Sequence, residues 1–184
     1  MSVARTKPSG KSLPKPGPIA LRAAQGAEAN VGVHEESENR GRYVKVYLRS
    51  VGLRPGEPWC AAFAYYRLAQ AALELRKRLP AGFPRSGYCP DYKSWAKESG
   101  FWLPASARAF RGDLCLFYFP KIGRIAHMGI VVKPLSSGAF WTVEGNTGPR
   151  GAVGEVDRNG DGVYRKLRRR SSLGRYGGFI RLGF

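Results

Sequence analysis

The sequence predicts an α+β fold in which N-terminal helices pack on an antiparallel β-sheet. In the first half of the 184-residue chain, apolar residues recur at helical spacing, whereas the second half holds short runs of β-branched and aromatic residues separated by turns. Helices followed by strands, without βαβ alternation, are typical of an antiparallel sheet. Because 43% of the residues are hydrophobic, a chain of this length buries a sizeable core.

Capping and helix-breaking residues set the expected element boundaries. Four helices are predicted, over residues 19–29, 42–51, 59–78 and 91–99. Gly52 is expected to end the second helix and Pro80 to stop the third, whose start is apolar on all sides and therefore buried. Five strands are predicted, over residues 114–119, 125–133, 139–144, 162–167 and 178–182.

The chain is strongly basic, with a net charge of +18. Residues 1–18 combine cations and prolines with no acid, so we expect a flexible basic arm there and a single folded domain over residues 19–184. Residues 165–170 form a second basic segment. Such charge attracts nucleic acid, acidic lipids or the anionic polymers of bacterial envelopes, or else forms only a solvated surface. The sequence has no zinc-finger, helix-turn-helix or RNA-binding aromatic motif, which argues against nucleic acid.

Neither a transmembrane segment nor a signal peptide is visible in the sequence. No apolar run approaches the roughly 20 residues that cross a bilayer. Residues 1–18 also lack the apolar centre of a signal peptide. We therefore expect synthesis in the cytoplasm and, for action outside the cell, release by another route.

Cys60 carries the clearest chemical signal. It lies in the motif Pro-Trp-Cys-Ala-Ala-Phe, residues 58–63, where a turn leads into the third predicted helix. Free N–H groups at a helix N-terminus favour negative charge, so a thiol there ionises below its usual pKa of about 8.5 and becomes nucleophilic. Cys115 is predicted to be a core residue of a strand. Cys89 is predicted to lie in a loop, either free or paired with Cys115 after export.

Strand alternation supplies partners for this thiol. It presents His127 on one face of a predicted strand, and Glu144 and Asn146 together on one face of the next. A histidine beside such acceptors is held through one ring nitrogen and offers the other to a nucleophile. Singly, these residues are a core histidine, an ion-paired carboxylate and a turn residue. Together with Cys60 they predict a cysteine hydrolase.

Metal binding is a weaker interpretation of the polar residues. The chain has two histidines, and His34 lacks the second histidine of a zinc-peptidase helix. Residues 157–162 imitate the start of a calcium loop, but the twelfth position holds Arg168 where a bidentate glutamate is required. We interpret this segment as a turn that enters a strand, with calcium as the alternative. The predicted site uses no metal and no cofactor.

The motifs resemble those of the CHAP family, cysteine- and histidine-dependent amidohydrolases and peptidases with a papain-like, NlpC-type fold. The matching stretches occur in the family's order, at residues 58–63, 111–114, 125–131 and 143–147, with shorter ones at 39–41 and 160–164. The resemblance implies a CHAP-like catalytic domain over residues 19–184. In it Cys60 is the nucleophile, His127 the general base, Glu144 the group that orients the imidazole, and Asn146 a supporting polar residue.

The resemblance also implies a substrate, bacterial peptidoglycan, cleaved by an N-acetylmuramoyl-L-alanine amidase or a crosslink endopeptidase. Phage lysins, virion-associated lytic proteins and antibacterial effectors act in this way, at the cell wall after release, injection or virion packaging. The basic arm and the segment 165–170 would then bind anionic envelope polymers. The alternatives are a cysteine hydrolase or acyltransferase acting on another amide, and a basic binding or structural module without catalysis.

One departure from the papain-like pattern concerns the oxyanion. Those enzymes often carry a glutamine a few residues before the nucleophile as a hydrogen-bond donor, whereas residues 53–57 of this chain contain neither Gln nor Asn. Arg54 or a backbone group would have to replace it, or the oxyanion hole would be incomplete.

Overall fold

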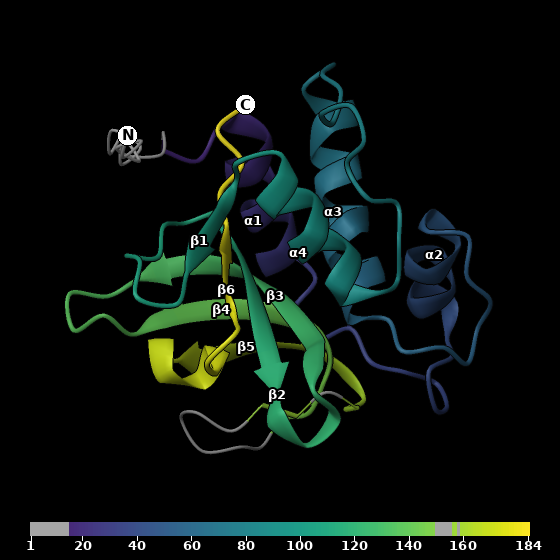
Figure 1. The fold of residues 1–184 in the computed structure, drawn as a ribbon. Coiled ribbons are helices and arrows are strands. Elements are labelled where there is room, and N and C mark those ends of the chain that lie inside the picture. The colour runs from purple at the N-terminus through teal and green to yellow at the C-terminus, as the bar shows by residue number, and fades with distance from the viewer. Residues whose placement is uncertain (1–14, 150–155, 158) are drawn as a thin grey trace, which may run out of the picture.

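Helices gathered on an antiparallel sheet make this an α+β protein (Figure 1). The computed structural model describes residues 15–149, 156–157 and 159–184. Within these residues, six strands form one sheet in the order β1-β6-β2-β3-β4-β5, and neighbouring strands are antiparallel. The elements are α1 (Pro18–Glu28), α2 (Arg42–Ser50), α3 (Cys60–Glu74), α4 (Cys89–Glu98), β1 (Trp102–Pro104), β2 (Leu114–Phe119), η1 (Pro120–Ile122), β3 (Arg124–Pro134), β4 (Phe140–Thr147), β5 (Gly162–Arg168), η2 (Arg170–Leu173) and β6 (Gly178–Ile180).

All four predicted helices are present, but α3 is shorter than predicted. It ends at Glu74 rather than near residue 78, because Arg76 adopts a left-handed conformation with φ 53°. The N–H of Arg76 bonds the carbonyl of Leu73 at 3.0 Å, and that of Lys77 bonds Ala72 at 2.8 Å. This is the Schellman arrangement, which satisfies the last carbonyls of a helix and closes it.

The start of α4 and the ends of some strands also differ from the prediction. α4 begins at Cys89, two residues before the predicted start, because Pro90 fits the first turn of a helix, where its missing N–H costs nothing. β2 has the predicted bounds, whereas β4 continues to Thr147. The edge strand β1 is absent from the predicted set, since it has three residues and ends in a proline.

The folded part begins before the predicted boundary at residue 18. Pro16 and Gly17, which the sequence assigns to the basic arm, are buried. The N–H of Gly17 bonds the carbonyl of Leu182 at 2.7 Å, and a side chain at this position would collide with the backbone of Phe184. The start of α1 is therefore held against the C-terminal segment. Residues 1–14 of the predicted arm lie outside the described residues.

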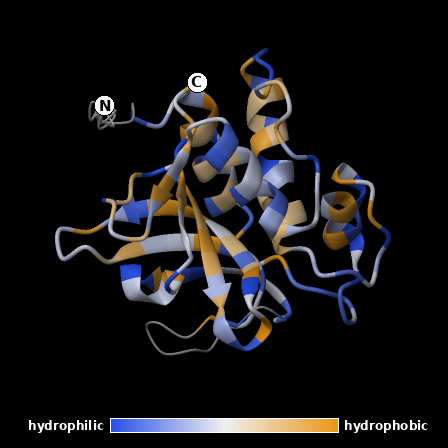
Figure 2. Ribbon diagram, viewed as in Figure 1, coloured by the Kyte–Doolittle hydropathy of each residue, from blue (hydrophilic) through white to orange (hydrophobic). Residues whose placement is uncertain are grey.

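α3 is the central helix of the main hydrophobic core. It packs against α1, α2, β3 and β4, and its first five residues, 60–64, are buried as their apolar character predicts. Gly145 lets β4 approach this helix, because a Cβ there would lie 2.6 Å from the Trp59 ring and 2.8 Å from Phe63. Figure 2 shows β2 as hydrophobic along most of its length, since its residues alternate between this core and a second hydrophobic cluster.

Candidate active site

Cys60 is the first residue of α3, and its side chain faces a cavity of about 290 Å³. The residue is only 4% exposed, so the thiol is shielded from bulk water but reachable through the cavity. The first N–H groups of a helix have no partner within the helix, and they favour negative charge on a nearby group. The position therefore suits a thiolate that receives a substrate from the cavity.

His127 lies on β3 and is fully buried. Its Nε2 is 2.8 Å from Oε2 of Glu144 on the neighbouring strand β4. Among the described residues, Nδ1 has no hydrogen-bond partner. This nitrogen is available to Cys60, whose thiol interacts with the imidazole and with the backbone N–H of Met128. The structure thus brings together Cys60, His127 and Glu144.

The carboxylate of Glu144 is held on both of its oxygens. Arg168 on β5 donates from Nε to Oε1 at 2.8 Å and from Nη2 to Oε2 at 2.7 Å. The hydroxyl of Thr142 donates to Oε1 at 2.5 Å. Gly129 provides the space, because a Cβ there would lie 2.5 Å from Cγ of Glu144. Such a bidentate, buried ion pair fixes the position of the oxygen that meets His127.

The electrostatics of the site favour a thiolate and an imidazolium. A hydrogen bond from Cys89 and the charge of His127 outweigh burial and hold the pKa of Cys60 well below its usual value. Burial disfavours the charged form of His127, but Cys60 and Glu144 together raise its pKa to about 9. Burial also opposes the charge on Glu144, yet the hydrogen bonds from Arg168 and His127 prevail and lower its pKa. The surroundings therefore favour the charged form of all three groups.

Asn146 does not lie on the face of Glu144, and here the alternation prediction is wrong. The pairing of β4 with β5 is irregular after Glu144, and Asn146 adopts a left-handed conformation with φ 56°. Its Oδ1 accepts a hydrogen bond from the N–H of Trp59 at 3.1 Å, and its Nδ2 donates to Asn39 at 3.0 Å. Asn146 therefore supports the backbone immediately before Cys60, and the imidazole is oriented by Glu144 without it.

Glu35 also holds this backbone, and the sequence prediction missed it. Its carboxylate accepts hydrogen bonds from Nε1 of Trp59 at 2.6 Å and from the N–H of Asn39 at 2.7 Å. The residue precedes Cys60 by 25 positions and lies in a segment without helix or strand periodicity. No local pattern points to this contact, which depends on how the segment before α2 folds onto the start of α3.

Arg168 belongs to the basic segment 165–170, but it is 0% exposed, and Lys166 is buried with it. Both interpretations of this segment, binding of an anionic partner and a solvated surface, need exposed cations, so neither holds for these two residues. The strand register explains the burial of Arg168: directly paired residues of antiparallel strands share a face, and Arg168 pairs with Phe140, which alternates in step with Glu144. The sequence does not reveal this register, so the run of basic residues gave no sign that Arg168 meets Glu144.

Cys89 contacts the candidate nucleophile. The Sγ atoms of Cys89 and Cys60 are 3.8 Å apart, and each residue is 4% exposed. Cys89 is thus neither a loop residue nor a neighbour of Cys115, which is buried in the second hydrophobic cluster. The hydrogen bond to Cys60, reinforced by burial, raises the pKa of Cys89 well above its usual value and so favours the protonated form of this thiol.

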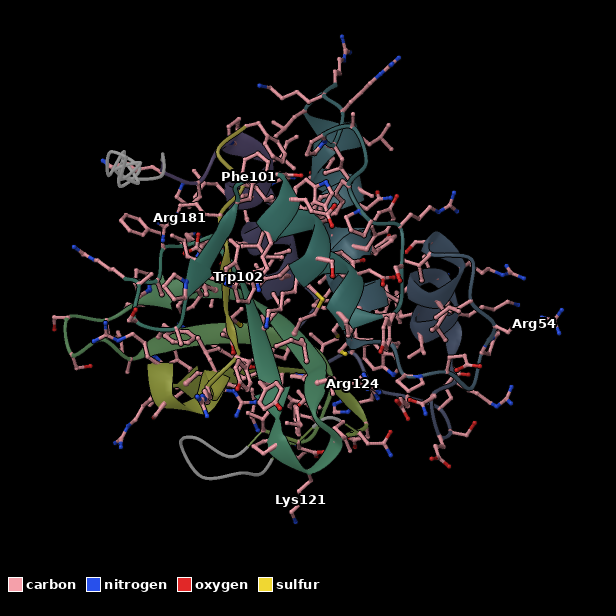
Figure 3. The ribbon with its side chains drawn as sticks, viewed as in Figure 1. Arg54, Phe101, Trp102, Lys121, Arg124 and Arg181 are labelled. Carbon is pink, nitrogen blue, oxygen red and sulfur yellow. The ribbon has the colours of Figure 1, made fainter. Side chains whose placement is uncertain are left out.

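Arg124 adds a positive charge to the cavity at Cys60. Its guanidinium lies over the ring of Tyr88, with Cζ 5.1 Å from the centroid, and Nη1 donates to the carbonyl of Ile125 at 3.2 Å. Among the described residues, no carboxylate forms an ion pair with it. Figure 3 shows Arg54 extending outward at the edge of the molecule, and Arg54 does not line this cavity. Arg54 is therefore not placed to donate to an oxyanion at Cys60, whereas the backbone N–H groups at the start of α3 are.

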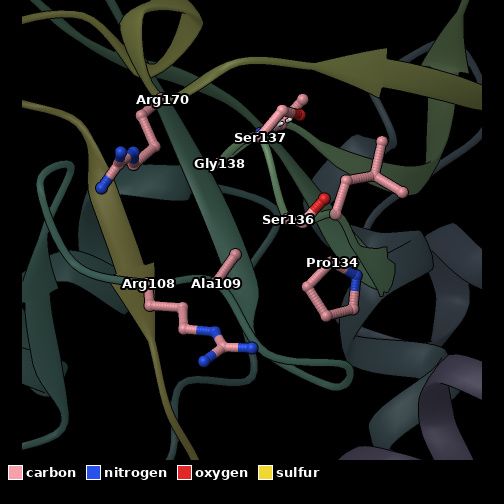
Figure 4. Close-up of a pocket in the computed structure, with 9 residues that line it drawn as sticks. Arg108, Ala109, Pro134, Ser136, Ser137, Gly138 and Arg170 are labelled. Carbon is pink, nitrogen blue, oxygen red and sulfur yellow. Dashed lines mark hydrogen bonds between the residues drawn. The ribbon is translucent and has the colours of Figure 1, made fainter.

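A second cavity, of about 450 Å³, lies between the hairpin that joins β3 to β4 and the start of η2 (Figure 4). Arg108 and Arg170 both line it and both are exposed. Arg169 lines an adjoining hollow. This cavity contains no cysteine or histidine and therefore no nucleophile of the kind found at Cys60.

The segment that imitates a calcium loop has other contacts. β5 begins at Gly162, the hydroxyl of Tyr164 donates to Asp161 at 2.9 Å, and Arg168 pairs with Glu144. Residue 158 lies outside the described residues. Within the part of the chain that the structure describes, no three or more His, Cys, Asp or Glu side chains are arranged to hold a metal ion.

Comparisons with known proteins find no match to this chain among protein-family models, curated proteins or solved structures. None of the described helices combines the length and the apolar character needed to cross a bilayer.

Proposed function

We propose that this protein is a cysteine hydrolase of bacterial peptidoglycan, acting as an N-acetylmuramoyl-L-alanine amidase or a crosslink endopeptidase with a papain-like CHAP fold. One observation carries the proposal. A thiol begins α3 beside an imidazole with a carboxylate 2.8 Å from Nε2, and Nδ1 has no hydrogen-bond partner among the described residues. This arrangement activates a nucleophile for attack on an amide. The CHAP-like motifs around the same residues link it to peptidoglycan.

In the proposed reaction, the thiolate of Cys60 attacks the carbonyl carbon of the substrate amide. The oxyanion accepts hydrogen bonds from N–H groups at the start of α3, each worth roughly 3–4 kcal/mol in the transition state. His127 gives its proton to the leaving amine, and a thioester remains on Cys60. Water then loses a proton to His127 and hydrolyses the thioester. Glu144 keeps the imidazole oriented and stabilises its charged form.

The charges around the site support an anionic substrate. Arg124 lines the cavity without a carboxylate partner among the described residues, so a carboxylate of the substrate is its natural counter-ion. The stem peptides of peptidoglycan carry free carboxylates close to the amides that such hydrolases cut. Arg108 and Arg170 at the second cavity suit the anionic polymers of the envelope. We place the action at the cell wall, after release, injection or virion packaging.

The decisive experiment follows the turbidity of purified cell walls. Cys60→Ala should slow lysis on the order of 10⁴-fold or more, because it removes the nucleophile. Cys115→Ala is the matched control: it removes a thiol from the second hydrophobic cluster and should leave most of the activity. Lysis that survives in folded Cys60→Ala would overturn the assignment.

The released fragments distinguish the two reactions. An amidase frees a new N-terminal alanine, whereas an endopeptidase opens the crosslink and leaves the glycan attachment intact. Mass spectrometry of the soluble products after digestion measures which bond is cut. Cell walls that yield no fragment, under conditions in which another amide is hydrolysed, would favour the alternative cysteine hydrolase.

A further inference from the structure

The pair of thiols at Cys60 and Cys89 has a chemistry that amide hydrolysis does not require. The two Sγ atoms are 3.8 Å apart, at the first residues of α3 and α4, and both residues line the cavity of about 290 Å³. A disulfide brings two sulfur atoms to about 2.05 Å, so closure needs an approach of about 1.8 Å. That distance is within the range of side-chain rotation.

We propose that Cys60 and Cys89 form an oxidation site at which a peroxide converts the two thiols into a disulfide that reversibly blocks the nucleophile. The bond itself depends only on the two cysteines. Its effect on catalysis rests on the proposed function, because a sulfur held in a disulfide cannot attack an amide.

The reaction balances with hydrogen peroxide as the oxidant. The thiolate of Cys60 attacks one oxygen, the O–O bond breaks, and the products are a sulfenic acid on Cys60 and hydroxide. Cys89 then loses its proton, and its sulfur attacks the sulfur of Cys60. The S–O bond breaks and a second hydroxide leaves. With the protons of the two original thiols, the hydroxides become two molecules of water.

The surroundings assign a different task to each thiol. The imidazole of His127 and the N–H of Met128 lie next to Cys60 and favour its anion, which is the form that reacts with peroxide. The Sγ of Cys89 lies 3.8 Å from that of Cys60, and the contact together with burial favours its protonated form, so Cys89 is the thiol that resolves the sulfenic acid. Cys115 is 0% exposed in the second hydrophobic cluster and does not line the cavity. It has no part in the exchange.

A resolving thiol protects the nucleophile. A sulfenic acid without a nearby thiol is oxidised further to sulfinic and sulfonic acids, which ordinary thiols do not reduce. With Cys89 in contact, the sulfenic acid is captured as a disulfide that dithiothreitol returns to two thiols. The enzyme would thus be silent in an oxidising setting and recover where thiols are kept reduced.

The test treats the purified protein with hydrogen peroxide and measures the intact mass under non-reducing conditions. The wild type should lose the mass of two hydrogens, and peptide mapping should join Cys60 to Cys89. Cys89→Ala and Cys89→Ser should instead gain oxygen on Cys60. Cys115→Ala should behave as the wild type. A wild type that gains oxygen without forming the bond, or that joins Cys115, would overturn the proposal.

Turbidity of purified cell walls supplies the second readout. Oxidised wild type should lose nearly all of its lytic activity and regain it in dithiothreitol, whereas the Cys89 variants should lose whatever activity they have and not regain it. Two variants guard against misfolding, because serine keeps the size of the thiol and alanine removes its polarity. The intact-mass measurement detects the disulfide whether or not the protein lyses cell walls. A protein that forms the bond but never lyses walls would contradict only the proposed function, and one that lyses walls but forms no bond would contradict only this inference.

Discussion

The cavity at Cys60 and the cavity between Arg108 and Arg170 differ in what holds their charged groups. Beside the first, His127 and Glu144 are 0% exposed and bonded to one another. At the second, the arginines are exposed, and Arg170 donates a hydrogen bond to a backbone carbonyl, that of Ser106, at 2.9 Å. Buried groups keep their positions and protonation states, whereas exposed cations act through a field that salt screens. The first cavity is therefore suited to bond cleavage and the second to attraction.

Among the charged groups of the two cavities, Arg168 should have the largest effect on the stability of the fold when it is replaced. Arg168→Met leaves the buried carboxylate of Glu144 without its cation, and we expect the free energy of unfolding to fall by about 3–5 kcal/mol. Urea denaturation measures this change. Arg169→Met is the matched control, because Arg169 is an exposed neighbour and its loss should cost no more than about 0.5 kcal/mol. Equal losses in both variants would mean that the buried pair does not organise the site.

The pH dependence of cell-wall hydrolysis tests the charged state of the first cavity. Activity should fall at low pH, as Cys60 gains a proton, and again as the pH rises through about 9, where His127 loses its proton. Glu144→Gln removes a group that raises the pKa of His127, so the alkaline limb should move to lower pH. A weaker imidazolium stabilises the thiolate less, so the acid limb should move to higher pH. The bell-shaped pH profile of Glu144→Gln should therefore be narrower than that of the wild type on both sides, and its kcat should be lower by up to about 10⁴-fold.

Thr142→Val is the control for this experiment. It removes a hydrogen bond to Glu144 but leaves the carboxylate in place, so both limbs should shift less than in Glu144→Gln. The raised pKa of His127 also makes the stability of the fold depend on pH. The charged imidazole stabilises the fold fully below 6.5, the pKa of His127 in the unfolded chain, and this contribution is lost as the pH rises through about 9, its pKa in the folded protein. A Glu144→Gln profile with unchanged limbs would show that the carboxylate does not set the protonation of the site.

Much of the first cavity follows from periodicity in the sequence. Alternation along β3 and β4 explains why His127 and Glu144 meet, because side chains on one face of adjacent strands are neighbours. The run of small apolar residues after Cys60 explains why the start of α3 is buried. The same reasoning recovers the bounds of β2 and the antiparallel sheet. The roles of these residues in catalysis stay predictions until activity is measured.

The remaining features depend on contacts that a local pattern does not encode. Asn146 leaves its expected face because the pairing of β4 with β5 is irregular, and a single irregularity reverses alternation. Cys89 meets Cys60 because two helix starts, 29 residues apart, converge on one cavity. Glu35 reaches Trp59 from a segment without regular structure. Each case depends on tertiary packing, which periodicity within one element cannot reveal.

Arg124 is intermediate between the buried, paired charges of the first cavity and the exposed arginines of the second. It is half-buried at the cavity of Cys60, and it has no carboxylate partner among the described residues. Arg124→Gln should lower kcat/KM about tenfold on fragments with free carboxylates, which corresponds to one charged hydrogen bond. Fragments with amidated carboxylates should lose much less. Lys121→Gln is the control, since Figure 3 shows Lys121 projecting outward from η1, just before β3. A loss that is the same for both kinds of fragment would assign Arg124 a structural role.

Replacing the arginines of the second cavity should have the smallest effect, a weaker attraction to cell walls that disappears at high salt. Replacing Arg108 and Arg170 together by glutamine should weaken sedimentation with walls that carry anionic polymers by a few fold at low ionic strength, because the pair contributes only to a screened field. Hydrolysis of small soluble fragments should not change. Arg54→Gln with Lys121→Gln removes the same charge from two exposed sites elsewhere. If both double variants bind walls equally weakly, the total charge of +18 drives the attraction and the cavity adds nothing to it. A loss confined to the Arg108 and Arg170 variant would make this cavity the site where the envelope polymer is held.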